Sequence, residues 1–182
     1  MPRRAAVTPP PTAYQRALRR LARRDHSVAE LRRGLLERDH APGEVEAALE
    51  RLRREGYLDD AGFAERFARS RMEHQGLGRL RVRQGLRQRG VDQGATDTGI
   101  ALALREVDEC LVLDGLARRY WRQHARVEPV RRLPRLWAFL LRRGFAPGLV
   151  QDRLCRLWPR WKDALDGLEP AEPAEAHGAE RE

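Results

Sequence analysis

The sequence has 182 residues, which is enough for one ordinary domain or a short array of small units. Charged residues make up 35% and aromatic residues only 6%, so any core is thin, and the abundance of Ala, Leu, Arg and Glu favours an all-α fold. The formal net charge is +9; five Glu oppose one Arg from Glu169 onward, a net of −4, so the rest of the chain carries +13. This basic body suits a polyanionic partner or a protein surface near nucleic acid. An Arg bias that only solubilises helices is the alternative.

The composition also bears on location and on cofactors. No apolar run approaches the length of a membrane span, and the start of the chain is followed by prolines rather than by the apolar segment of a secretory signal. We therefore expect a reduced, cytoplasmic protein. Cys110 and Cys155 sit in apolar helical patterns, so we expect small core residues rather than metal ligands or a disulfide. No cofactor is expected.

Residues 1–12 contain four prolines and little to bury, which predicts a disordered arm. Three helices are predicted after it, because apolar residues recur at helical spacing at Tyr14/Leu18/Leu21, Val28/Leu31/Leu35 and Val45/Leu49/Leu52. Ser27 and Glu30 have the spacing of a capping box at the start of the second helix. Pro42 and Gly43 open the third helix, and Gly56 ends it.

The same pattern then returns twice. Leu35, Asp39 and Gly43 are followed 51 residues later by Leu86, Gly90 and Gly94, and 54 residues further on by Leu140, Gly144 and Gly148. A period near 50 residues is typical of a repeat array in which each unit mainly contacts its neighbours. We predict three tandem three-helix repeats in an elongated, curved array, over 13–58, 59–109 and 110–162. Residues 163–182 are predicted to form an acidic, disordered tail.

Four stretches in register resemble the RecX family over nearly all of residues 13–160. They are 22–31 (ARRDHSVAEL), 52–64 (LRREGYLDDAGFA), 78–91 (GRLRVRQGLRQRGV) and 140–145 (LLRRGF). Asp39 departs from the family pattern, which often has Gly there. The resemblance implies a cytoplasmic, non-enzymatic protein that binds the filament of RecA on single-stranded DNA along its groove and damps RecA's ATPase, strand-exchange and co-protease activities. The alternative is a helical protein that binds DNA directly, without RecA. A monomer is expected.

Arginines crowd the predicted middle helix of every repeat. With Val82 and Leu86 toward the core, a helical turn places neighbouring arginines on the flanks and outer face. Guanidinium groups there can pair with carboxylates bidentately or contact phosphates; a solvated face with weak surface pairs is the alternative. The candidate partner-binding residues are Arg32, Arg33, Arg79, Arg81, Arg83, Arg87, Arg132, Arg135, Arg142 and Arg143.

Other motifs favour structural roles. One carboxylate of the pair Asp59 and Asp60 is expected to cap the helix that follows rather than to bind a metal, because no third ligand is spaced nearby. Ser27 is expected to act as a helix cap rather than as a nucleophile activated by His26. Gly76 and Gly78 precede a helix without the Lys-Ser/Thr of a phosphate loop, which favours a hinge.

Overall fold

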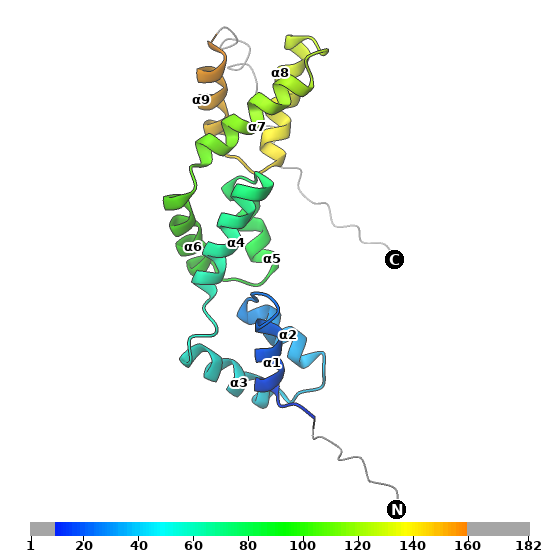
Figure 1. Ribbon diagram of the computed structural model, residues 1–182, viewed down its shortest axis with the longest axis vertical. Helices are drawn as coiled ribbons and strands as arrows, with labels where there is room; N and C mark the ends of the chain where they lie inside the picture. The colour runs from blue at the N-terminus through cyan, green and yellow to red at the C-terminus, as the bar shows by residue number, and fades with distance from the viewer. Residues whose placement is uncertain (1–9, 160–182) are drawn as a thin grey trace, which may run out of the picture. The chain divides into compact units, whose positions relative to one another are not determined.

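The computed structural model describes residues 10–159, and this part of the chain is all-α, with nine helices and no strand (Figure 1). The predicted arm is therefore described only from Pro10, and the predicted tail at 163–182 lies outside the described residues. The helices are α1 (Ala13–Leu21), α2 (Val28–Leu36), α3 (Pro42–Arg54), α4 (Asp60–Gln75), α5 (Arg79–Gln88), α6 (Gln93–Glu106), α7 (Glu109–Gln123), α8 (Pro129–Arg142) and α9 (Pro147–Leu157).

Short polar side chains start most of these helices. Thr12 and Ser27 each accept a hydrogen bond from the amide three residues on, and the side chains of Gln15 and Glu30 complete the two capping boxes. Asp92 caps α6 and Asp108 caps α7 in the same way. Helices α3, α8 and α9 begin with Pro, whose fixed φ suits the first helical position.

The nine helices of the described residues follow one another as three groups of three, α1–α3, α4–α6 and α7–α9. A residue with positive φ follows the middle helix of each three-helix group. Asp39 has φ +60°, Gly90 +74° and Gly144 +86°. Glycine adopts this conformation without strain, and aspartate is one of the few side-chain-bearing residues that enters it routinely. The turn after α2 therefore keeps the left-handed geometry even though Asp39 replaces the Gly of the other two groups.

The described residues form two compact units. The first consists of the described chain up to Gln75 together with Val82–Val107, and the second consists of Gly76–Arg81 together with the described chain from Asp108. In the first unit, helices α1–α3 enclose a core that includes Leu31, Leu35 and Leu52. Gly99 on α6 lets this helix approach α4, because an added Cβ would lie 2.4 Å from the Cβ of Ala64.

The second unit has its own core, formed by α7, α8 and α9. Fully buried side chains at its centre include Leu136, Leu140 and Phe145. Cys155 packs against this core but, like Cys110, keeps partial solvent exposure, and neither forms a disulfide within residues 10–159. The prediction that both cysteines are core residues is thus too strong, because both side chains are only partly buried. None of the helices between residues 10 and 159 has the length and apolarity that a membrane span requires.

Candidate partner-binding site

The arginines predicted to face a partner lie on the three middle helices α2, α5 and α8, except Arg143, which directly follows α8. On α5, Val82 and Leu86 are fully buried, whereas Arg81, Arg83 and Arg87 are exposed. The helical period therefore places the apolar side chains in the core and leaves the guanidinium groups on the surface.

Three of these arginines already form ion pairs within the protein. Arg32 donates two hydrogen bonds to Glu46, at 2.6 and 2.8 Å. Arg83 pairs with Asp97 at 2.6 Å, and Arg79 lies 3.6 Å from the Glu109 carboxylate. The Arg32–Glu46 and Arg83–Asp97 pairs are exposed on both sides, whereas the Glu109 carboxylate is buried. Exposed pairs contribute little to stability, about 0.2–1 kcal/mol each, so Arg32 and Arg83 can exchange them for a partner's carboxylate at low cost.

Four other predicted arginines are exposed and form no side-chain hydrogen bond or ion pair within residues 10–159. They are Arg33 on α2, Arg87 on α5, and Arg135 and Arg142 on α8. Guanidinium groups of this kind are the strongest candidates for contact with an acidic surface, because binding breaks no ion pair within the described residues.

Arg132 has a different role from the one predicted. It is only 7% exposed, and its guanidinium donates to the carbonyl oxygens of Ala125 and Val127 in the turn between α7 and α8. The same group lies over the ring of Trp121, 4.3 Å from its centroid. Helical spacing alone suggested a surface arginine, but the turn preceding α8 folds over this side chain. Arg132 is therefore a structural residue rather than a partner-binding one.

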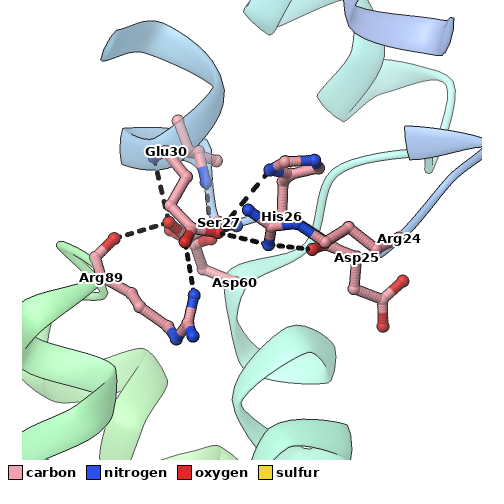
Figure 2. A network of polar contacts seen from close by, with 8 residues as sticks. Arg24, Asp25, His26, Ser27, Glu30, Asp60 and Arg89 are labelled. Carbon is pink, nitrogen blue, oxygen red and sulfur yellow. Dashed lines mark hydrogen bonds and ion pairs between the residues drawn. The ribbon is translucent and has the colours of Figure 1, made fainter. Parts of the chain in front are cut away.

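A network of polar contacts joins α2 to the following three-helix group within the first unit (Figure 2). Ser27 Oγ accepts from the Glu30 amide at 3.1 Å and donates to the carbonyl oxygen of Arg89 at 2.6 Å. The Asp60 carboxylate accepts from the Val28 amide at 3.0 Å. The first amides of α2 are thus capped partly by its own Ser27 and partly by a side chain 32 residues further along the chain.

The electrostatics of this network centre on Glu30. Its carboxylate lies 2.5 Å from Arg89 Nη1 and 3.4 Å from Arg24 Nη1. Burial pushes the pKa of Glu30 upward, but the Arg89 guanidinium and the Ser27 amide outweigh it and hold this pKa below its ordinary value. Glu30 is therefore ionised at neutral pH and links α2 to the end of α5.

Asp59 and Asp60 cap two different helices. Asp59 caps α4, because its carboxylate accepts from the amides of Ala61 at 3.0 Å and Gly62 at 2.9 Å. Asp60 instead caps α2 from the neighbouring group, and burial raises the pKa of its carboxyl. Within the described residues no group of three His, Cys, Asp or Glu side chains is arranged to hold a metal ion.

The second unit contains a similar contact, in which a helix start is capped by the next three-helix group. We call these two contacts the first joint (around Val28 and Asp60) and the second joint (around Arg79 and Glu109). Glu109, the first residue of α7, accepts from the amide of Arg79, the first residue of α5, at 2.8 Å. The Gly78 amide donates to the Arg143 carbonyl at 2.9 Å, and the Leu80 amide to the Gly144 carbonyl at 3.0 Å. Val28 and Arg79 are 51 residues apart, which is the repeat period, so the same helix end is capped by the next three-helix group in both places.

Close packing at both joints depends on glycine. An added Cβ at Gly144 would lie 2.4 Å from the Cβ of Arg81, and one at Gly90 would lie 2.5 Å from the Cβ of Ala29. Arg81 and Arg143 thus lie at the second joint, where their backbones form the contact, and the Arg143 guanidinium lies over Phe139. The Gly76–Gly78 segment, predicted as a hinge, forms part of this joint.

We did not predict from the sequence that one three-helix group caps a helix of another. Asp60 and Glu109 gave a usable signal, because each is an acidic first residue of a helix that follows a short turn. A first-turn acid suits its own helix dipole equally well, so the sequence alone does not show that the carboxylate caps a different helix.

Two stretches of the chain match domains of a known family: residues 13–52 match the first three-helix domain of RecX, and residues 59–98 match the second. The chain is 45% identical over 140 residues to the regulatory protein RecX of Halorhodospira halophila, an alignment that covers 74% of this chain and 81% of that relative. The chain belongs to the RecX family. The regulatory protein RecX of Escherichia coli strain SE11 is 37% identical over 163 residues, covering 81% of this chain and 90% of that relative.

Solved RecX structures have the same fold. The crystal structure of RecX from Lactobacillus salivarius superposes with a TM-score of 0.73 at 17% identity, covering 80% of this chain and 94% of that chain. A second RecX crystal structure has a TM-score of 0.67 at 25% identity, covering 77% and 70%. The family resemblance and the all-α three-helix fold expected from the sequence are thereby confirmed, and the chain is a member of a family of regulatory proteins.

Proposed function

We propose that this RecX family member binds the filament that RecA forms on single-stranded DNA, lies along the filament groove, and lowers RecA's ATPase, strand-exchange and co-protease activities. The observation that carries the proposal is the 45% identity to a relative named a regulatory protein, over 81% of that relative. On this account the protein is a non-enzymatic cytoplasmic monomer that acts in DNA recombination, DNA repair and the SOS response.

The surface of the middle helices supports a charged contact. Arg33, Arg87, Arg135 and Arg142 carry exposed guanidinium groups without internal ion pairs in the described chain. Arginine forks bind carboxylates of a protein surface bidentately, and they also bind phosphates. A basic body steers association with a DNA-loaded filament, so we expect inhibition to weaken as salt concentration rises.

The joints support a second part of the mechanism. In each of them the next three-helix group caps α2 or α5 and packs a left-handed glycine against the start of that helix. Bonds of this kind hold consecutive groups together as each contacts the filament. A bound protein that resists deformation opposes the protomer motions that accompany ATP turnover, and it blocks access to the groove.

The test is RecA ATPase on single-stranded DNA, titrated with the protein. Reversing Arg33 and Arg87 together to Glu is expected to raise the half-inhibitory concentration at least about tenfold, which corresponds to about 1.4 kcal/mol. Reversing Arg105 and Arg118 to Glu changes the net charge equally on exposed positions outside the middle helices, and is expected to shift it less than about threefold.

Two results would overturn the proposal. One is the absence of ATPase inhibition by the unmodified protein at low salt. The other is equal loss of inhibition in both double variants, because that would reduce the contact to net charge. Direct DNA binding without RecA, the alternative function, predicts instead that affinity for single-stranded DNA is unchanged when RecA is added.

A further inference from the structure

An open hollow in the first unit is lined mainly by arginines that are not among the predicted partner-binding residues. Its volume is about 460 Å³, and its lining residues are Arg20, Arg23, Arg24, His26, Glu37 and Arg38. They come from the end of α1, the turn that follows it, and the end of α2. Four guanidinium groups thus face one carboxylate, so the hollow carries a net positive charge.

Most of this charge is not neutralised by side chains within residues 10–159. Arg24 pairs with Glu30 at 3.4 Å and donates to the Asp25 carbonyl at 3.0 Å. The side chains of Arg20, Arg23 and Arg38 form no hydrogen bond or ion pair with any of residues 10–159. Clustering three such guanidinium groups costs free energy through mutual repulsion, and a bound anion removes that cost.

Gly34 on α2 determines where Arg20 lies. An added Cβ at Gly34 would lie 2.0 Å from Arg20 Nη1 and 2.6 Å from its Cζ. The guanidinium therefore rests against the bare backbone of α2, in space that any other residue would fill. This placement distinguishes the hollow from a general cluster of surface arginines.

His26 supplies a further polar group in the wall. Its side chain is 4% exposed, and its buried Nδ1 atom lies 3.7 Å from the Glu30 carboxylate, which is too far for a hydrogen bond. Burial lowers the pKa of His26, and the charges of Arg24 and Arg20 lower it further. A neutral imidazole still carries one N–H, which can donate to an anion.

We propose that this hollow binds a phosphate group. The oxygens of a phosphate can accept hydrogen bonds from several guanidinium forks at once, whereas a carboxylate has two oxygens and satisfies fewer of them. Arg20, Arg23 and Arg38 are the direct ligands, and Gly34 is a positioning residue for Arg20. The phosphate comes either from a free phosphate compound or from the backbone of a nucleic acid, and both supply the same chemistry.

The test follows the amide and side-chain NMR signals of the first unit at constant ionic strength, with no RecA present. One arm titrates pyrophosphate and the other a single-stranded oligothymidylate. Saturable shifts that centre on Arg20, Arg38 and His26 are expected in at least one arm. Binding in the pyrophosphate arm identifies free phosphate as sufficient, and binding in the oligonucleotide arm alone identifies a phosphodiester chain.

Gly34→Ala is the decisive variant, because it displaces the Arg20 guanidinium without changing the net charge. We expect it to weaken binding about tenfold, the typical effect of losing one charge-assisted bidentate contact. Arg38→Ala is expected to act similarly. Arg19→Ala removes a charge from α1, the helix that carries Arg20, but outside the hollow, and is expected to change affinity less than about twofold.

Folding does not confound the comparison. Alanine favours the helix more than glycine does, and the displaced group is the mobile end of a long side chain, so the melting temperature of Gly34→Ala should not fall. The proposal is overturned if neither ligand binds, if Gly34→Ala and Arg38→Ala bind as the unmodified protein does, or if Arg19→Ala weakens binding as much as they do. Because RecA is absent, these outcomes are independent of the filament proposal.

Discussion

The capping of α2 by Asp60 predicts a measurable loss when this carboxylate is removed. Asp60→Ala deletes the acceptor 3.0 Å from the Val28 amide and leaves this part-buried N–H without a protein partner. Loss of a helix cap costs about 0.5–2 kcal/mol, and the first turn of α4 loses a favourable acidic group as well. We expect Asp60→Ala to destabilise the joint by about 1–2 kcal/mol. Asp60→Asn keeps an acceptor, and because burial raises the pKa of Asp60, loss of the charge itself is expected to cost little.

Amide hydrogen exchange is the appropriate assay, because a chain with two compact units need not unfold in a single step. The Val28 amide is expected to exchange about five- to thirty-fold faster in Asp60→Ala. Asp97→Ala is the matched control, since Asp97 belongs to the same unit but forms only the exposed pair with Arg83. Equal exchange at Val28 in the two alanine variants would refute the capping role of Asp60.

Three further outcomes are expected. Gly144→Ala should lower the free energy of unfolding by about 2–4 kcal/mol in denaturant titrations, because φ is +86° and the new Cβ meets Arg81. Gly115→Ala, in open helical space, should be neutral or stabilising, and a smaller loss at Gly144 than at Gly115 would contradict this. Arg132→Met should lower the free energy of unfolding by about 2–4 kcal/mol, because it leaves turn carbonyls unpaired, and should change Trp fluorescence, because the guanidinium leaves the Trp121 ring. An effect on stability no larger than that of Arg135→Ala would show that the buried bonds are unimportant. The folded pKa of His26 lies below its unfolded value of about 6.5, so the free energy of unfolding should fall as pH drops from that value through the folded pKa. His26→Gln should flatten this part of the pH profile, and an unchanged profile would exclude His26 as its source.

The local features of the fold could be predicted from the sequence because they depend on neighbouring residues. The capping box of Ser27 and Glu30 spans three positions, and Pro42 and Gly56 act on the helix that they adjoin. The repeat period also placed Asp39 in register with Gly90 and Gly144, and all three have the same left-handed conformation.

The features that remained hidden depend on residues far apart in the chain. The bond from Ser27 to the Arg89 carbonyl spans 62 residues, and the one from Arg79 to Glu109 spans 30. Helical periodicity assigns a side chain to a face but does not show what folds over that face, so the prediction that Arg132 is a surface residue is wrong. The space that Gly34 leaves for Arg20 likewise exists only after α1 packs on α2.

The central claim is that the filament, rather than DNA alone, is the partner. The most direct measurement is the fluorescence anisotropy of the dye-labelled protein, titrated at one salt concentration with RecA–single-stranded DNA filaments and, separately, with the same DNA alone. The account predicts at least about tenfold tighter binding to the filament, or about 1.4 kcal/mol. Equal affinity for filament and naked DNA, or no binding to the filament, would contradict it.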